Sequence, residues 1–463
     1  MLNLTYMRKN VKNYIHNSQL THTKHLTRCP LSNHIYSGLS SYQKTTQNYS
    51  IGNNRQTFQP ILKYIPSNIW AAISSVLKYI FYSKHDFITS DKASQNSHYI
   101  VPDTLKIAIA GDWGAGTEEA FVVSNEMMKF DGSIPDITIH LGDIYYVGGK
   151  NEVCQNCLGG KDENGQQKFP AKDSVLWNSG SLGSFALNAN HEMLANGTAY
   201  FDNFLPKLGM LNDKKEPQGQ GTSFFCLENN FWRILAIDTG YNSAGLLSGK
   251  PETLCKLEDS HIEWIKSLIP ENDTKATILL SHHQYFSAFE DNYTLPSKQL
   301  SEIFKVPIIW LWGHEHRASG YDLFNMENIS LQAYGRCIGN GGMPVDALEP
   351  STDPLHILQN NKLIYYDARI NPIYAGGGQI PPVGINGYSH FLFDGPKLSI
   401  KHKFLVCDGS EFNNPSYPTS ETLITEMFTC SGSSIQWVGL QGPTLPIKGF
   451  NIKTNLHFTT SVV

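Results

Sequence analysis

Side chains of the kinds that bind metal ions recur at five places in the middle of this chain. Each place is a short cluster in which a small residue precedes the polar ones: GDWG, GDIYY, ANHE, SHH and GHEH. Carboxylate, amide, phenol and imidazole groups bind hard and borderline cations, and together they could hold two metal ions for hydrolytic chemistry. The candidate ligands are Asp112, Asp143, Tyr146, Asn190, His282, His314 and His316.

Each cluster follows a run of apolar residues that is typical of a buried β-strand. A Gly-Asp pair alone means little, because it ends many strands as ordinary turn chemistry. In open α/β sheets, however, ligands gather at the carboxyl ends of the parallel strands. The sequence therefore predicts that the five clusters meet. The predicted strands are residues 105–110, 184–187, 277–280 and 306–312, and the run from Ile137 that ends at Gly142.

In their order and spacing, the clusters resemble the five motifs of calcineurin-like metallophosphoesterases, across roughly residues 105–317. The version with a tyrosine resembles the purple acid phosphatases, whose motifs read GDxG, GDxxY, GNH[DE], VxxH and GHxH. The wider family usually has a histidine two places after the first aspartate, where this chain has Gly114, and Tyr146 would supply the missing ligand. Three positions depart from the pattern: Ala189 replaces a glycine, Leu279 a valine and Gln284 a frequent proline.

The resemblance implies an α/β fold, a four-layer α/β/β/α sandwich, with a dinuclear metal centre at the strand ends. Asp143 would bridge the two ions. A tyrosinate at the first metal favours Fe(III) there, with Zn(II), Mn(II) or Fe(II) as its partner. Tyr146 rather than Tyr145 is expected among the ligands, because neighbouring strand residues point to opposite faces. The implied ligands are Asp112, Asp143, Tyr146 and His316 for the first ion, and Asp143, Asn190, His282 and His314 for the second.

Two further histidines are expected to act on the substrate. By resemblance, His191 contacts the phosphate or serves as the general acid. His283 directly follows a ligand and either supports it or contacts the substrate. Arg317 follows the last ligand, and a surface ion pair is its expected role rather than a phosphate contact.

The implied reaction is hydrolysis of a phosphate ester by hydroxide formed at the metals. The resemblance favours a monoester, either a small phosphate ester or a phosphoprotein, and no nucleic acid. A diester such as a nucleotide or a phospholipid head group is the alternative. A catalytically silent binding or effector protein on the same fold is a further alternative, against which the complete set of ligands argues.

The chain changes in charge near residue 86. The net charge is −5, yet residues 1–85 hold 10 of the 36 Lys and Arg residues and none of the 41 Asp and Glu residues. This composition, rich in Asn, Ser, Thr, Tyr and Gln, predicts a basic and partly disordered arm over residues 1–100. We expect a catalytic domain over residues 103–409, and a small β appendage or loose tail over residues 410–463.

Apolar residues at helical spacing predict one helix in the arm, over residues 67–82. The helix would either dock on the catalytic domain or contact a membrane surface, and Ser74, Ser75 and Lys78 interrupt it too often for a membrane span. No apolar core follows Arg8 and Lys9, so no secretory signal peptide is expected. A cytoplasmic location, import into an organelle and export by another route stay open, as does the oligomeric state.

Cys154 and Cys157 lie in a polar, glycine-rich insertion, residues 148–165, directly after the second cluster. A single CxxC pair is a weak sign of structural zinc, and a disulfide is expected only outside the cytosol. We therefore expect two free thiols on a loop near the site. The loops at residues 148–173 and 286–297 are expected to select the substrate.

Overall fold

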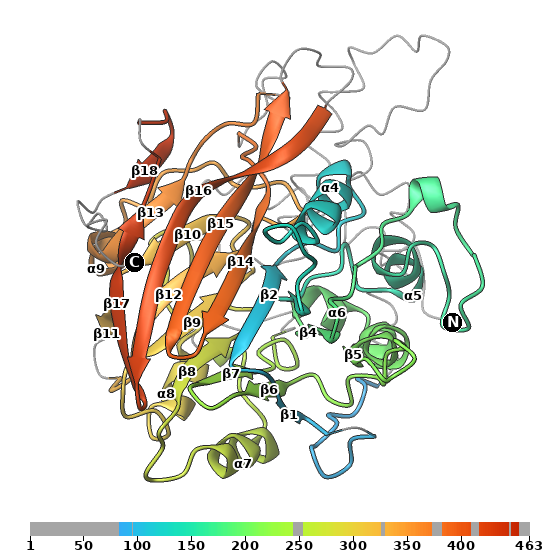
Figure 1. The fold of residues 1–463 in the computed structure, drawn as a ribbon, viewed down its shortest axis with the longest axis horizontal. Coiled ribbons are helices and arrows are strands. Elements are labelled where there is room, and N and C mark those ends of the chain that lie inside the picture. Colours follow the sequence, from blue (N-terminus) through green and yellow to red (C-terminus); the bar gives the residue numbers. More distant parts are fainter. Residues whose placement is uncertain are drawn as a thin grey trace, which may run out of the picture.

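The computed structural model describes residues 83–94, 96–243, 253–325, 329–372, 382–408, 416–443 and 446–452, and its strands form two large sheets (Figure 1). The predicted helix over residues 67–82 lies outside the described residues, as does most of the predicted arm. None of the described helices is long and apolar enough to cross a membrane.

The first sheet has eight strands. Their bounds are β2 Thr104–Ala110, β3 Ile137–His140, β4 Gly183–Ala186, β5 Gly209–Met210, β14 Gly387–Asp394, β15 Lys397–Asp408, β16 Ser416–Ser431 and β17 Ser434–Gln441. The strand order is β17-β16-β15-β14-β2-β3-β4-β5. Strands β2, β3 and β4 are parallel, with Ile107 opposite Ile137 and Ile137 opposite Gly183, so their carboxyl ends share one edge.

The second sheet has ten strands. Their bounds are β1 His98–Ile100, β6 Phe225–Glu228, β7 Trp232–Ala236, β8 Ala276–Leu280, β9 Ile308–Trp312, β10 Ala318–Tyr321, β11 Phe324–Asn325, β12 Gln332–Ile338, β13 Leu363–Asp367 and β18 Phe450–Ile452. The order is β1-β6-β7-β8-β9-β12-β10-β13-β18, with β11 paired to β12. Strands β7, β8, β9 and β12 are parallel neighbours. Their carboxyl ends therefore form a second shared edge.

Side chains alternate along these strands and thereby build separate cores. In β2, Leu105, Ile107 and Ile109 pack between the sheets, whereas Ala108 and Ala110 belong to the core on the outer side. Strand β9 alternates in the same way, because Ile309 and Leu311 join the core between the sheets and its tryptophans join the opposite core. This period of two is what the apolar runs predicted.

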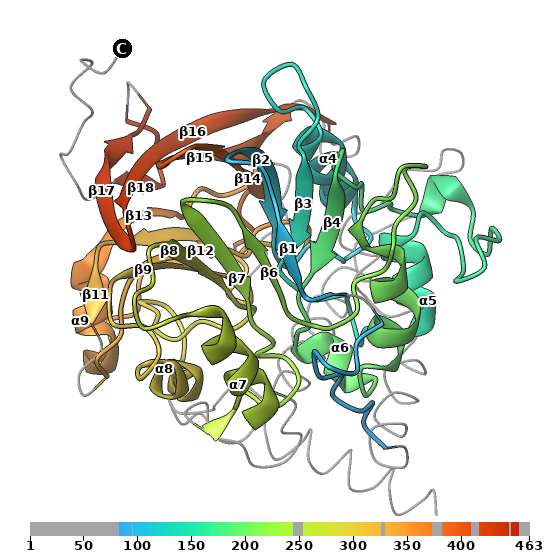
Figure 2. The ribbon, with the colours of Figure 1, turned by 60° about the horizontal axis from the view of Figure 1, so that its bottom comes forward.

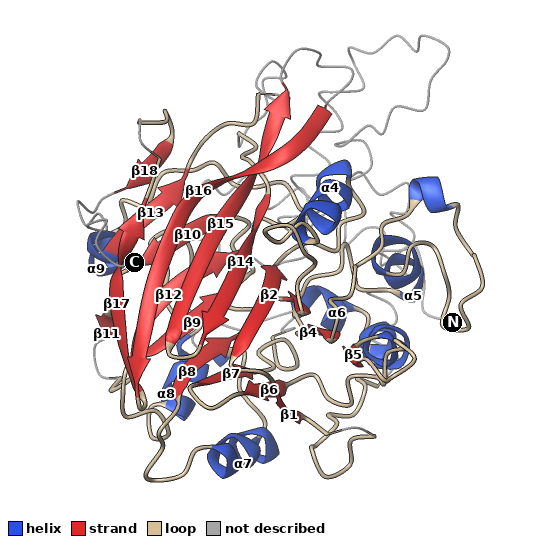
Figure 3. Ribbon diagram, in the orientation of Figure 1, coloured by secondary structure: helices blue, strands red, loops and turns tan. Residues whose placement is uncertain are grey.

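Helices cover the outer face of each sheet (Figure 2). Their bounds are α4 Glu118–Met127, α5 Lys150–Glu152, α6 Asn190–Leu194, α7 Asp259–Leu268, α8 Thr294–Leu300 and α9 Ile357–Lys362. Ala120 and Val123 of α4 pack on the first sheet, and Ile265 of α7 and Leu300 of α8 pack on the second. Strands predominate between these layers (Figure 3). The predicted α/β/β/α order is confirmed.

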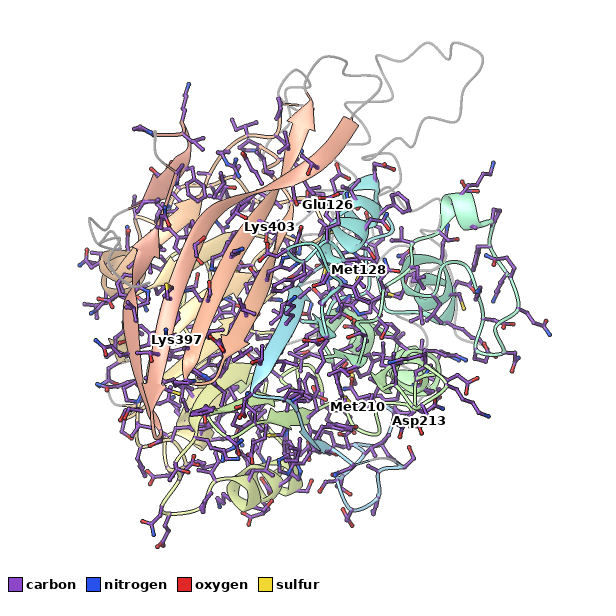
Figure 4. The ribbon with its side chains drawn as sticks, in the orientation of Figure 1. Glu126, Met128, Met210, Asp213, Lys397 and Lys403 are labelled. Atoms are coloured by element: carbon purple, nitrogen blue, oxygen red, sulfur yellow. The ribbon has the colours of Figure 1, made fainter. Side chains whose placement is uncertain are left out.

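The predicted C-terminal extension is part of both sheets. Strand β16 pairs with β15 from Thr429 opposite Lys397 to Ser416 opposite Asp408, and β18 pairs with β13 in the other sheet. Helix α4 contacts β16: the Glu126 carboxylate accepts a hydrogen bond from the Ser420 amide at 3.1 Å. Figure 4 shows Glu126 near Lys403 of β15. The described residues beyond 410 are therefore integrated with the domain rather than appended to it.

Three buried side chains from different strands form a charge triad: Arg336 of β12, His402 of β15 and Glu426 of β16. Arg336 Nε donates to Glu426 Oε1 at 2.8 Å, and His402 Nε2 lies 2.9 Å from the same oxygen. Arg336 and Glu426 are both 0% exposed. The triad thereby joins the C-terminal strands to the second sheet.

The end of the predicted arm also packs on the body. The His85 ring stacks on Phe201 with centroids 4.4 Å apart, and Phe87 meets the Tyr241 ring at 5.0 Å. The Tyr241 hydroxyl donates to the His85 carbonyl at 2.8 Å. Residues 85–87 are thus docked on the loop that follows β7.

Candidate metal centre

The carboxyl ends of the parallel strands from both sheets meet, and they bring the predicted ligands together. Asp112 follows β2, Asp143 follows β3, and Asn190 follows β4, while His282 follows β8 and His314 follows β9. Backbone bonds join the two sheets at this edge: the Gly111 amide donates to the Ile338 carbonyl at 2.9 Å. The structure places each of the five predicted strands within two residues of its predicted bounds.

One group of ligand atoms belongs to Asp112, Asp143 and His316, whose donor atoms all lie within 4.8 Å of one another. His316 Nε2 is 3.5 Å from Asp112 Oδ1. Asp112 Oδ2 accepts a hydrogen bond from the His314 amide at 2.6 Å, which leaves Oδ1 facing the group. These three residues are the ones predicted for the first metal ion, apart from the tyrosine.

A second group is centred on His282. Its Nε2 lies 3.3 Å from Asp143 Oδ2, 3.1 Å from Asn190 Oδ1 and 3.3 Å from His314 Nδ1. Its Nδ1 donates to the Leu141 carbonyl at 2.8 Å, so Nε2 is the nitrogen free to bind a cation. The four residues predicted for the second metal ion thus converge, and Asp143 belongs to both groups.

The structure places Tyr145, which was not expected among the ligands, in the first group. The Tyr145 hydroxyl lies 2.8 Å from Asp112 Oδ1, 2.9 Å from Asp143 Oδ2 and 2.7 Å from His316 Nε2. The prediction that Tyr145 points away from the ligands is therefore wrong. The expected alternation fails because β3 ends at His140, and Asp143 turns the chain with a φ of 72°. The backbone of Tyr146 also contributes, since its carbonyl lies 2.5 Å from His191 Nδ1.

Four of the predicted ligands have a backbone conformation that L-residues rarely adopt. The φ angles are 54° at Asp112, 72° at Asp143, 66° at His314 and 46° at His316. Each such residue costs about 1–3 kcal/mol and persists only where the surrounding structure enforces it. Glycine permits the close packing, because a Cβ at Gly313 would lie 2.7 Å from Asp112 Oδ2. The strand ends thus hold the side chains at the expense of local strain.

Burial and mutual charge shift the pKa values in the centre strongly. Burial and the nearby Asp143 carboxylate raise the pKa of Asp112 well above its usual value. Burial also opposes ionisation of Asp143, but His191 and His282 outweigh it and hold its pKa well below the usual value. Burial lowers the pKa of His282, yet the Asp143 charge reverses this and raises it to about 9. The centre therefore favours a positive charge beside Asp143.

The two histidines expected at the substrate occupy different places. The His191 amide donates to Asp143 Oδ1 at 3.2 Å, and its Nε2 is 3.8 Å from Asp143 Oδ2, so this ring borders the centre. The His283 ring is positioned by two neighbours. Its Nδ1 lies 3.0 Å from the Thr239 hydroxyl, and its ring packs on the His314 ring with centroids 4.6 Å apart. Burial, together with His314 and His282, lowers the pKa of His283 well below its usual value.

Sequence reasoning missed several contributors to the site. The Tyr293 hydroxyl lies 3.3 Å from His314 Nε2, and this residue is in the loop that was expected to select the substrate. The loop after β12 wraps Asp112, whose carbonyl accepts hydrogen bonds from Gly342 at 3.1 Å and Met343 at 2.9 Å. Its GNGG sequence directly follows an apolar run, which is the same strand-end signal that identified the five clusters.

The insertion after the second cluster packs behind the site. The Asn156 amide donates to the carbonyls of Gly114 at 3.2 Å and Tyr145 at 3.1 Å. Cys154 and Cys157 on either side of it are free cysteines, and both are buried. Arg317, expected at the surface, is instead buried 3.9 Å from Glu315, since the Phe289 ring covers it at 4.0 Å.

The donor set fits metal ions. Oxygen atoms of Asp143 and Asn190 and Nδ1 of His314 lie 3.1–3.3 Å from His282 Nε2. These nitrogen and oxygen donors are of the kinds that bind borderline divalent cations. A third group of potential ligands, which includes His98 and Glu228, does not fit. Lys275 Nζ lies 2.8 Å from Glu228 Oε1, and Arg233 Nε lies 3.1 Å from Oε2, so both carboxylate oxygens already have cationic partners.

Two facing sheets with convergent metal-type ligands at their parallel strand ends define a metallophosphoesterase fold and site. Residues 105–318 match the calcineurin-like phosphoesterase family, and this part of the chain belongs to that family. The match supports a metal-dependent phosphoesterase, a class of phosphoric ester hydrolases.

Comparisons over the whole chain find only low sequence identity. A solved structure titled "Structure of PhoD" is similar to it at 13% identity, with 75% of this chain and 73% of that chain covered and a TM-score of 0.43. None of the curated proteins matches the chain significantly.

Proposed function

We propose that the protein hydrolyses phosphate monoesters at a dinuclear metal centre. The observation that carries the proposal is the position of Asp143 between the two ligand groups. Its Oδ2 lies 2.9 Å from the Tyr145 hydroxyl in the first group and 3.3 Å from His282 Nε2 in the second. A carboxylate shared in this way suits a pair of cations in one phosphoesterase site.

The first ion would be held by Asp112, Asp143 and His316 with the Tyr145 phenol, and the second by Asp143, Asn190, His282 and His314. A phenolate ligand favours Fe(III) at the first position, with Zn(II), Mn(II) or Fe(II) at the second. Two such ions would supply Lewis-acid activation of water and stabilise negative charge on the phosphoryl oxygens.

The chain's own residues would orient the substrate and move a proton. His191 is 2% exposed, and its Nδ1 is engaged by the Tyr146 carbonyl, so that nitrogen carries the proton. Its Nε2 borders Asp143 and is placed to protonate the leaving oxygen of the ester. His283 and Tyr293 pack on His314 and would hold that ligand in place.

The preference for monoesters is supported by the tyrosine-containing motif set, which resembles that of purple acid phosphatases. Purified protein supplied with Mn²⁺, or with iron and zinc, is expected to cleave p-nitrophenyl phosphate faster than bis(p-nitrophenyl) phosphate. Chelation is expected to abolish turnover. If the diester reacts faster, the protein is a phosphodiesterase rather than a monoesterase. If neither ester is cleaved although metal is bound, the result favours a binding protein.

His191→Ala tests the assigned proton donor. Loss of general acid catalysis lowers rates about 100-fold or more, so kcat for phenyl phosphate, whose basic leaving group needs protonation, is expected to fall by that factor. Metal content should stay unchanged, because the His191 ring borders Asp143 without belonging to either ligand group. Equal loss of metal and rate, measured by elemental analysis and steady-state kinetics, would mean that His191 is a ligand instead.

A further inference from the structure

The carboxylate of Glu152 organises the loop that follows the second cluster. It accepts hydrogen bonds from three backbone amides of the turn that precedes it, those of Tyr146, of Val147 at 3.1 Å and of Gly149 at 2.9 Å. Burial raises the pKa of Glu152, and the same three amides oppose this rise. Glu152 belongs to the insertion over residues 148–165.

One peptide group links this carboxylate to His191. The N–H of the peptide between Tyr146 and Val147 donates to Glu152 Oε2 at 3.1 Å, and its carbonyl lies 2.5 Å from His191 Nδ1. A negative charge on the N–H side polarises the peptide and strengthens its carbonyl as a hydrogen-bond acceptor. The carboxylate therefore acts on the imidazole without touching it.

This linkage fixes both the tautomer and the direction of the imidazole. A carbonyl can only accept a hydrogen bond, so Nδ1 must carry a proton and Nε2 is the nitrogen that exchanges one. The Tyr145 ring packs against the imidazole, with ring centroids 4.4 Å apart. With Nδ1 held at one end, Nε2 is directed toward Asp143, 3.8 Å from its Oδ2.

We propose that Glu152 is a positioning residue for His191, acting through the peptide group between Tyr146 and Val147. The inference rests on the proposed function, because it requires His191 to protonate the leaving oxygen. Removing the charge of Glu152 leaves the metal ligands untouched, so it should impair proton donation and little else.

The test compares Glu152→Gln with wild type on two monoesters that differ in their need for an acid. Phenol is a more basic leaving group than p-nitrophenol and depends more on protonation, so kcat for phenyl phosphate should fall about tenfold. The value for p-nitrophenyl phosphate should change less than twofold, and metal content should be unchanged. Glu163→Gln is the matched control, since Glu163 lies in the same insertion and pairs only with Lys150 among the described side chains, at 2.7 Å. It should behave as wild type.

A double variant separates positioning from general damage to the loop. In a His191→Ala background, Glu152→Gln should cause no further loss on phenyl phosphate, because the group it positions is gone. Equal losses on both esters, no loss on either, or an additive loss in the double variant would overturn the inference. If Glu152→Gln does not fold, Glu152→Asp replaces it, because the shorter side chain withdraws the carboxylate from the Tyr146–Val147 peptide, and the same pattern of losses is expected. A wild-type protein inactive toward both esters, with metal bound, overturns the proposed function and the inference with it.

Discussion

The metal centre and the charge triad both bury ionisable side chains, yet they shift the pKa of a buried carboxyl group in opposite directions. Glu426 of the triad and Asp112 of the centre are each 0% exposed. Burial raises the pKa of both, but Arg336 and His402 overcome it at Glu426 and lower the pKa to about 2. At Asp112, the neighbouring Asp143 adds to burial, and the pKa rises well above its usual value.

The difference lies in what the protein itself supplies. In the triad, Arg336 also donates to the Tyr321 carbonyl at 2.5 Å, and His402 Nδ1 lies 2.8 Å from the Ser389 hydroxyl. Its charges are balanced within the chain. In the centre, two carboxylates share the Tyr145 hydroxyl, and the ligand backbones are strained. The triad is complete as a structural unit, whereas the centre is built to receive positive charge from outside.

The largest expected effect is on stability, from removing one carboxylate in each region. Glu426→Gln leaves Arg336 buried without a counter-charge and should lower the free energy of unfolding by about 3–5 kcal/mol. Asp112→Asn, measured in chelator, should not lower it, since the pKa of Asp112 shows that its charge is unfavourable there. Urea unfolding measures both. Glu421→Gln on the same strand is the control: the Glu421 side chain is 49% exposed and lies 3.8 Å from Arg369, so its loss should cost less than about 1 kcal/mol.

The same comparison can be made with pH. The pKa of Glu426 is about 2 in the fold and 4.5 ordinarily, so its stabilisation is present above pH 4.5 and is lost as pH falls toward 2. By linkage this amounts to about 3 kcal/mol. The difference in unfolding free energy between wild type and Glu426→Gln should therefore narrow over that window. A constant difference would show that the carboxylate is not ionised in the folded protein.

A smaller effect distinguishes two tyrosines. The Tyr365 hydroxyl lies 3.0 Å from His402 Nε2, so Tyr365→Phe should lower the free energy of unfolding by about 1 kcal/mol and leave turnover unchanged. Tyr145→Phe should instead lower turnover and leave the free energy of unfolding unchanged. With iron bound under oxidising conditions, a phenolate ligand absorbs visible light, and Tyr145→Phe should remove that band. If Tyr146→Phe removes it instead, the phenol ligand is the one that the motif resemblance named.

The strands and the meeting of the ligands could be predicted from the sequence for a physical reason. Apolar alternation identifies buried strands, and parallel strands bring their carboxyl ends to one edge. Tyr145 could not be assigned in this way, because the alternation rule stops where β3 ends at His140 and the φ of 72° at Asp143 redirects the chain.

A β appendage was among the expectations for the C-terminal residues, but their place in the two main sheets escaped prediction for a different reason. Strand β16 has the sequence SYPTSETLITEMFTCS, in which polar residues hide the apolar alternation. Its buried Glu426 pairs with Arg336, which lies 90 positions earlier, and no local pattern reports such a contact. Docking of His85 and Phe87 likewise depends on aromatic partners far along the chain.

The number of metal ions bound per chain tests the central claim most directly. Asp143 belongs to both ligand groups, so elemental analysis should find two ions in the wild type and a loss of both in Asp143→Asn. The Glu421→Gln control should retain two. A wild-type protein that binds one ion or none under the same loading, or an Asp143→Asn variant that retains two, would contradict the account.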